Sequence, residues 1–121
     1  MSGRLLRPAA WLYAVGLILL TLGPAGVRPE TAMPHYLEHL AAFGISGLLF
    51  VAGYRDRGVL LIFFGAAFAA SLEVLQVWAP GRHARITDLA TDASGFWIGV
   101  AVGLIILRWF VDSRRSRESA G

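Results

Sequence analysis

Residues 85–109 read RITDLATDASGFWIGVAVGLIILRW, and this stretch decides the fold. From residue 93 onwards it is apolar over a length that suits a helix crossing a bilayer. Asp88 and Asp92 lie one helical turn apart, on the side that the three glycines of the stretch continue. These glycines are Gly95, Gly99 and Gly103. Because small residues at this spacing let a neighbouring helix approach closely, we predict that this side, with both aspartates, faces other helices.

Three further stretches are apolar and nearly free of charge, namely residues 9–22, 37–54 and 58–79. The first is short for a span of about 17–25 residues, and the other two are long enough. No stretch alternates with a period of two, which a membrane β-barrel would require. The sequence therefore predicts an all-α integral membrane bundle of four transmembrane helices, formed by a single domain over residues 1–111. Residues 112–121 are polar and are predicted to be a disordered cytoplasmic tail.

Residues 1–25 also have the layout of a signal peptide, with a basic start, an apolar run and a small residue at Ala25. The proline directly before Ala25 and the length of the run favour retention of the first helix. Cleavage is the alternative, and it would leave three helices.

The composition excludes several classes of function. The chain has a net charge of +3, but its arginines flank the apolar stretches instead of forming a patch, so nucleic acid is not an expected partner. The chain lacks cysteine, which excludes disulfides, thiolate zinc sites and a cysteine nucleophile.

The arginines predict the orientation in the membrane. With the N-terminus inside, the inner side holds eight of them: Arg4, Arg7, Arg55, Arg57, Arg108, Arg114, Arg115 and Arg117. The outer side holds Arg28, Arg82 and Arg85. Positive charge on the inner side predicts a multi-pass membrane protein with both termini in the cytoplasm.

This topology gathers the chemically capable side chains at the outer membrane face. The predicted ligand-binding residues are His39, Glu73, Gln76, Arg82, Asp88 and Asp92. Ionisable groups inside a membrane are costly, and they often mark working sites. The asymmetry between the two faces is the main functional signal of the sequence.

Several roles stay open for these residues. Glu73 and Gln76 share a helix face and could simply join helices by a hydrogen bond. Asp88 could cap its helix, whereas Asp92 lies a turn deeper and needs a cation or a proton donor. Its candidate partners are Arg82, Arg85 and His39. His35 and His39, at the i and i+4 positions, could present two imidazoles to a metal, but this spacing is common by chance, and we expect neither a metal nor a cofactor.

Order and spacing of these residues resemble the VanZ-like family of small bacterial membrane proteins. The similar segments are HLAAF from His39, EVLQVWAPGR from Glu73, and DLATDASGFWIG from Asp88. The resemblance covers about residues 35–103 and departs from the family in two places. His35 and Tyr36 stand where the family commonly has an Asp-Lys pair, and Asp92 stands where it usually has Asn. These changes remove a cation and add an acid.

The resemblance implies a role in the cell envelope, because the family is named for a protein that gives low-level resistance to teicoplanin, a lipoglycopeptide. We expect a non-enzymatic protein of the bacterial cytoplasmic membrane that binds or shields a lipid-linked or cell-wall ligand at the outer leaflet. Membrane lipids are expected partners, and a second copy of the chain is a further candidate. A membrane enzyme acting on an envelope lipid or cell-wall precursor is the alternative, with His39 and Glu73 as base and orienting group. Ser71 and Ser94 do not lie in a recognisable nucleophile motif. Proton transport and a purely structural polar layer are further alternatives.

Overall fold

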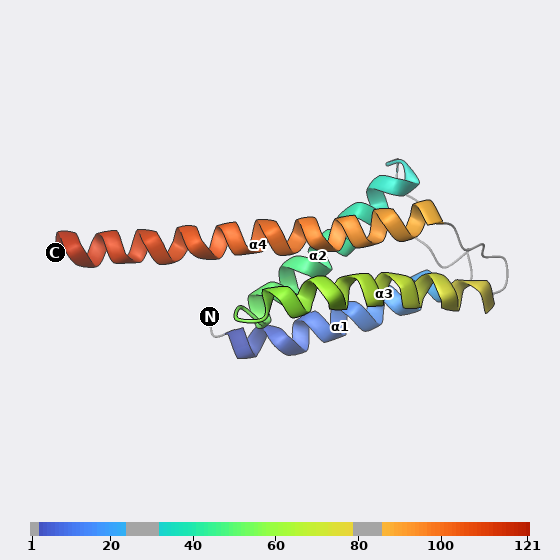
Figure 1. Cartoon of the computed structure of the whole chain (residues 1–121), viewed down its shortest axis with the longest axis horizontal. Helices are drawn as coiled ribbons and strands as arrows, with labels where there is room; N and C mark the ends of the chain where they lie inside the picture. Colours follow the sequence, from blue (N-terminus) through green and yellow to red (C-terminus); the bar gives the residue numbers. More distant parts are fainter. Residues whose placement is uncertain (1–2, 24–31, 79–85) are drawn as a thin grey trace.

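The computed structural model describes residues 3–23, 32–78 and 86–121, and these fold into four helices (Figure 1). They are α1 (Gly3–Leu22), α2 (His35–Gly53), α3 (Gly58–Trp78) and α4 (Ile86–Ala120). Each is long and apolar enough to cross a membrane. The described part of the chain contains no strand, so the predicted all-helical bundle of four membrane helices is confirmed.

The helix α1 is longer than the apolar stretch that predicted it, because it begins at Gly3 and includes Pro8. Pro8 is the sixth residue of α1 and has no N–H, so the carbonyl of Arg4 loses its intrahelical hydrogen bond although the helix continues past it. The guanidinium of Arg7 docks this turn on the end of α2, where its Nε donates a hydrogen bond of 3.0 Å to the Gly53 carbonyl. Residues outside the apolar run therefore become part of the bundle.

The most extensive helix contact joins α2 to α4, and glycines on both helices make it close. A Cβ atom on Gly95 would lie 2.6 Å from the Leu40 carbonyl oxygen, and one on Gly99 would collide with the backbone of Gly44. On α2, a Cβ atom on Gly47 would collide with the backbone of Phe96. In lipid, where apolar surface gives little driving force between helices, this backbone contact supplies packing energy.

An aromatic cluster fills the space between α2, α3 and α4. The ring centroids of Phe50 and Phe64 are 4.9 Å apart, and that of Phe96 lies about 6 Å from each of them, at 6.0 Å and 5.9 Å. Phe96 fits because α3 has a glycine opposite, Gly65, on which a Cβ atom would collide with the ring. Gly103 gives similar room to the side chain of Val51.

The predicted disordered tail is helical in the structure, because α4 continues through residues 112–120 and projects beyond the other three helices (Figure 1). Residues 104–120 contain neither glycine nor proline, and the segment extends a helix that is already nucleated, so each added residue needs no new nucleation. The hydroxyl groups of Ser116 and Ser119 also donate hydrogen bonds to backbone carbonyls of the preceding turn. The sequence predicts disorder here because the segment is polar, whereas the structure describes residues 112–120 as helix.

The two ends of the bundle differ in chemistry. The carboxylate end comprises residues 35–43, 72–78 and 86–93, where α2 and α4 begin and α3 ends. The arginine end comprises residues 3–7 and 54–58, which include the start of α1 and the tight turn between α2 and α3. This turn is closed by hydrogen bonds from the Tyr54 N–H to the Phe50 carbonyl and from the Arg57 N–H to the Tyr54 carbonyl.

Candidate functional site

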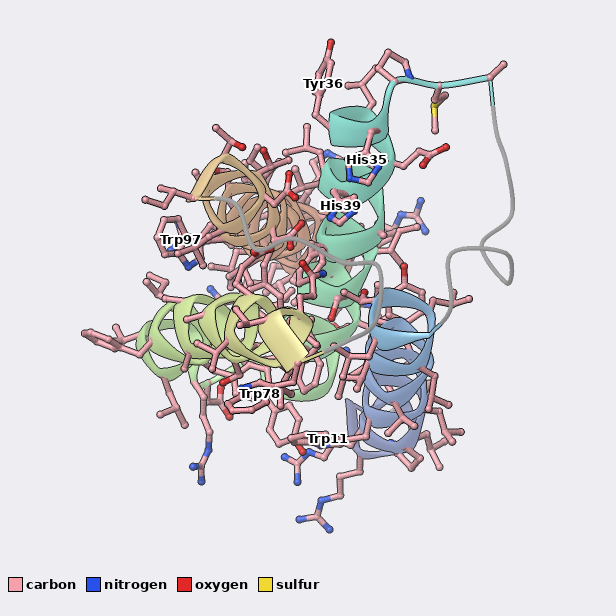
Figure 2. All side chains as sticks on the ribbon, turned by 90° about the vertical axis from the view of Figure 1, so that its right-hand side faces the viewer. Trp11, His35, Tyr36, His39, Trp78 and Trp97 are labelled. Carbon is pink, nitrogen blue, oxygen red and sulfur yellow. The ribbon has the colours of Figure 1, made fainter. Side chains whose placement is uncertain are left out.

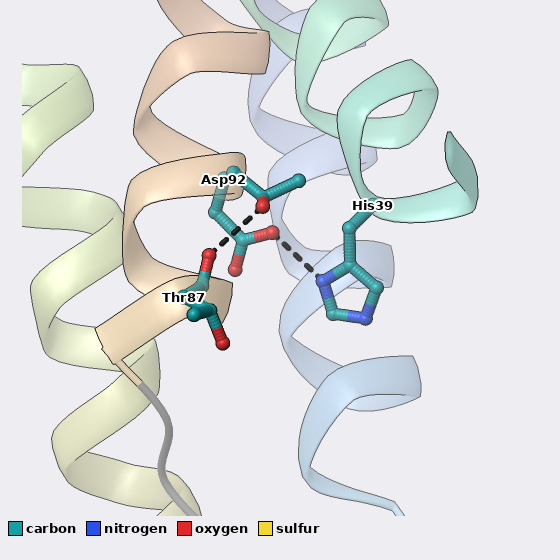
Figure 3. Close-up of polar contacts among 4 residues, drawn as sticks. His39, Thr87 and Asp92 are labelled. Carbon is teal, nitrogen blue, oxygen red and sulfur yellow. Dashed lines mark hydrogen bonds and ion pairs between the residues drawn. The ribbon is translucent and has the colours of Figure 1, made fainter. Parts of the chain in front are cut away.

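A buried histidine–aspartate pair lies at the centre of the carboxylate end (Figure 3). Nδ1 of His39 on α2 lies 2.7 Å from Oδ1 of Asp92 on α4. Asp92 is fully buried, and His39 is 8% exposed. An ionised carboxylate can only accept a hydrogen bond, so with Asp92 ionised Nδ1 carries the proton and Nε2 is the second nitrogen of the ring. Of the partners considered for Asp92 from the sequence, the structure therefore gives His39.

The close crossing of α2 and α4 positions the pair. Asp92 precedes Gly95 by one turn, and His39 neighbours Leu40, whose carbonyl faces Gly95. The two side chains therefore meet where the backbones are near each other and lipid is excluded. A buried carboxylate is costly unless it is hydrogen-bonded, and the short bond to His39 supplies one partner.

The second oxygen of the same carboxylate is less well satisfied. Oδ2 of Asp92 is buried and has no hydrogen-bond partner in the described part of the chain. An acceptor left in this state costs about 1–3 kcal/mol. The arrangement therefore favours a further hydrogen-bond donor beside Asp92.

The other predicted site residues differ in how far they are buried, and one of them is not described. Glu73 and Gln76 are buried, at 6% and 4% exposure, near the end of α3, which places them inside the bundle at the carboxylate end. Asp88 is half-buried in the first turn of α4, where a negative charge meets the positive end of the helix dipole. Arg82, with Arg85 as the other predicted cation, lies outside the described residues.

The two histidines of α2 contact each other, with ring centroids 4.4 Å apart, but they differ in exposure because His35 faces outward at the start of the helix (Figure 2). Within residues 3–23, 32–78 and 86–121, no three His, Asp or Glu side chains are grouped in a way that could hold a metal ion.

A groove of about 310 Å³ opens beside His39, between α1 and α2. Its walls are mainly apolar and include Leu17 and Phe43, while Glu38, His39 and Thr21 add polar groups towards the carboxylate end. Tyr13 also lines it and donates a 2.8 Å hydrogen bond to the Ala42 carbonyl. His39 thus contacts the buried carboxylate with one ring nitrogen and also borders the groove.

Sequence reasoning missed the contribution of α1 to this site. Ala10, Ala14, Leu17 and Thr21 are buried at helical spacing on one face of α1, and Tyr13 lies beside them. That periodicity was visible in the sequence and indicates a packing face. Thr21, at 4% exposure, is the polar residue of this face and marks its end near the site.

The VanZ/LLP1 family model matches residues 10–108, whereas no curated protein and no solved structure matches the chain. The matched residues include parts of all four helices, both members of the histidine–aspartate pair and the three glycines of α4. They also contain the segments whose order and spacing resemble the family. Since the match covers most of the sequence, this multi-pass membrane chain belongs to the VanZ/LLP1 family.

Proposed function

We propose that this chain is a non-enzymatic protein of the cell envelope that binds a lipid-linked ligand at the outer face of the cytoplasmic membrane. The polar group of the ligand lies at the carboxylate end, and its apolar chain lies in the groove between α1 and α2. The observation that carries the proposal is the buried His39–Asp92 pair beside a mainly apolar groove between α1 and α2.

The pair supports binding because it is more than a hydrogen bond between two helices. The glycine contact already holds α2 and α4 together, so a buried carboxylate is not required for that purpose. Asp92 also keeps a buried oxygen without a partner among the described residues. A donor group of a ligand, such as a hydroxyl or an amine, would satisfy that oxygen and lower the free energy of the complex.

The groove supports an amphiphilic ligand because its surface changes character along its length. Leu17, Leu20 and Phe43 offer apolar contact for an acyl or prenyl chain, and Thr21 and Glu38 add polar groups. A ligand with one polar head and one long chain matches both parts, whereas a fully polar cell-wall fragment would leave the apolar wall unused.

The outer location rests on the distribution of charge. The arginine end carries Arg4, Arg7, Arg55 and Arg57, and positive residues favour the cytoplasmic side. The carboxylate end then faces outward, where precursors of the cell wall and lipoglycopeptides of the teicoplanin type are found. Protection against such an antibiotic is the phenotype that family membership suggests. A reporter fused after Gly81 tests this orientation, because activity of a cytoplasmic reporter there would contradict it.

The first experiment compares two alanines that are adjacent in α2. Ala42 lines the groove, so Ala42→Leu fills it, whereas Ala41 is exposed and Ala41→Leu faces lipid. Each protein is purified from membranes of the same host, and the lipids that remain bound are identified by mass spectrometry. We expect an envelope lipid that accompanies the native protein and Ala41→Leu but is lost from Ala42→Leu at equal thermal stability. Equal lipid content in all three proteins would refute binding in the groove.

The pair itself is tested in cells. Asp92→Asn and Glu73→Gln keep shape and remove a carboxylate, and Arg82→Ala removes the cation predicted from the sequence. Normal membrane abundance and stability with altered teicoplanin susceptibility would support a ligand site. Loss of folded protein in step with any change in susceptibility would instead support a structural polar layer.

The short His39–Asp92 bond also favours a second candidate, a membrane hydrolase or transferase. A carboxylate on Nδ1 orients an imidazole so that its Nε2 can act as a base. The attacking group would have to be water or a substrate hydroxyl, because Ser71 donates to the Ala67 carbonyl on the exposed side of α3 and Ser94 is exposed. Turnover of labelled lipid-linked precursor by the purified protein, abolished by His39→Gln, would favour this candidate over binding alone.

A further inference from the structure

A second groove lies at the opposite end of the bundle and is not used by the proposed function. We call it the tryptophan groove; it has a volume of about 420 Å³ and is bordered by Trp11 of α1, Phe50 and Tyr54 of α2, and Leu60 and Phe64 of α3. Trp11 packs edge-on against two of these rings, with centroid distances of 5.1 Å to Phe50 and 5.8 Å to Phe64. The wall of the groove is therefore largely aromatic, with its rings packed against one another.

Two guanidinium groups border the tryptophan groove. Arg57 lines it directly, and Cζ of Arg7 lies 4.6 Å from the centroid of the Tyr54 ring, which is one of its walls. The Nε of Arg7 is held by the Gly53 carbonyl, and the Tyr54 hydroxyl accepts a 2.9 Å hydrogen bond from Trp11. These contacts fix the position of Arg7 and Tyr54, while Arg57 is an exposed side chain in the first residue after the turn.

The surroundings of the groove are strongly positive. Residues 3–7 and 54–58 contain Arg4, Arg7, Arg55 and Arg57, and Asp56 is the acid among them. All of these side chains are exposed. An anionic group at the rim would therefore meet several guanidinium groups, and a planar guanidinium is well suited to a phosphate.

We propose that the tryptophan groove is a binding site for an anionic phospholipid. One acyl chain lies along Trp11 and Phe64, and the phosphate lies between Arg57 and Arg7. The apolar wall requires a chain, because an aromatic groove facing lipid is filled by hydrocarbon. The cationic rim selects the head group, because basic residues at a membrane surface favour anionic lipids. This site is separate from the carboxylate end, so its failure would leave the proposed function unaffected.

The competing explanation is that the arginines only set topology. In that case each would attract anionic lipid by its general charge, and the location of the arginine would not matter. A specific site differs, because it requires Arg57 and concentrates the lipid beside Trp11. An experiment that reports lipid contact at one tryptophan distinguishes the two.

Quenching of tryptophan fluorescence by brominated acyl chains provides that report. The full chain carries Trp78→Phe, Trp97→Phe and Trp109→Phe, so that Trp11 is the remaining fluorophore. It is reconstituted in vesicles of phosphatidylglycerol and phosphatidylcholine at equal mole fractions, with bromine on one lipid or on the other. A second reporter protein keeps Trp78, which is 83% exposed at the carboxylate end, in place of Trp11.

We expect brominated phosphatidylglycerol to quench Trp11 more than brominated phosphatidylcholine. The charge of Arg57 should enrich phosphatidylglycerol beside Trp11 by about fivefold. Arg57→Gln should remove most of this preference, and Arg57→Lys should retain part of it. Arg117→Gln removes the same charge from the projecting part of α4 and should leave the preference unchanged.

Four results would overturn the site. Equal quenching by the two lipids would show that the groove holds bulk lipid, and equal effects of Arg57→Gln and Arg117→Gln would show general attraction. A lack of quenching by either lipid would show that protein covers the groove. The Trp78 reporter fixes the baseline, since the same preference at both tryptophans would also count against a local site.

Discussion

The substitution Gly99→Ala tests the contact on which the fold and the site both depend. A Cβ atom on Gly99 would collide with the Gly44 carbonyl oxygen and lie 2.8 Å from its carbon and 3.0 Å from its Cα. These are backbone atoms, so a change of side-chain rotamer cannot relieve the contact, and α2 and α4 must separate.

The size of the effect follows from two opposing contributions. Overpacking a close contact costs about 1–3 kcal/mol, and here the upper part of that range applies because the neighbour is backbone. Replacing glycine by alanine within a helix returns about 0.5–1 kcal/mol. We therefore expect Gly99→Ala to lower the free energy of unfolding by about 1–2 kcal/mol.

The matched control is Gly16→Ala in α1, where a Cβ atom would meet no other atom within 4 Å. This change keeps the gain in helix propensity without a collision, so its stability should equal or exceed that of the native protein. Thermal unfolding in detergent, followed by circular dichroism, compares the three proteins. If Gly99→Ala unfolds at the same temperature as Gly16→Ala, the close crossing of α2 and α4 is not what holds the bundle.

Four other substitutions, at three positions, are expected to separate the remaining contributions to stability in the same unfolding assay. Asp92→Leu deprives His39 of its partner and should cost about 1–3 kcal/mol, whereas Asp92→Asn keeps an acceptor and should cost less; equal losses would contradict the hydrogen bond. Phe96→Ala should cost about 3–5 kcal/mol by opening a cavity in the aromatic cluster, and a loss below that range would show that the helices close over it. Tyr13→Phe removes the hydrogen bond to Ala42 and should cost about 0.5–1.5 kcal/mol, so an unchanged protein would mean that this bond adds no stability.

The sequence was sufficient to predict the four membrane helices and the side of α4 that packs against the other helices. The spacing of Asp92, Gly95 and Gly99 on one face identified the surface that packs on α2, because small residues are useful only where backbones meet. The choice among partners for Asp92 was open, because Arg82, Arg85 and His39 are all near it in the predicted topology. The register between α2 and α4 brings His39 to Asp92, whereas Arg82 and Arg85 lie outside the described residues. This register follows from glycines on both helices, including Gly44 and Gly47.

Two features could not be predicted by the same reasoning. The sequence predicts disorder beyond Val111 because the segment is polar and has no apolar face to bury. A helix that is already formed can nevertheless continue through exposed residues, as α4 does here. The groove beside His39 depends on the distance between α1 and α2, and hydrophobic pattern alone does not fix the distance between two helices in lipid. Thr21 and Tyr13 therefore had no assigned role before the structure placed them beside the site.

The unequal attachment of the helices has a consequence for binding. α4 is held to α2 by backbone contact at glycines, which leaves no room for sliding. α1 is joined to α2 by side-chain hydrogen bonds from Arg7, Trp11 and Tyr13, of which the first two lie towards the arginine end. Side-chain hydrogen bonds between membrane helices are worth about 0.6 kcal/mol on average, so α1 can move at smaller cost than α4. If the proposed ligand binds beside His39, we therefore expect it to displace α1 at the carboxylate end while the His39–Asp92 pair stays in place.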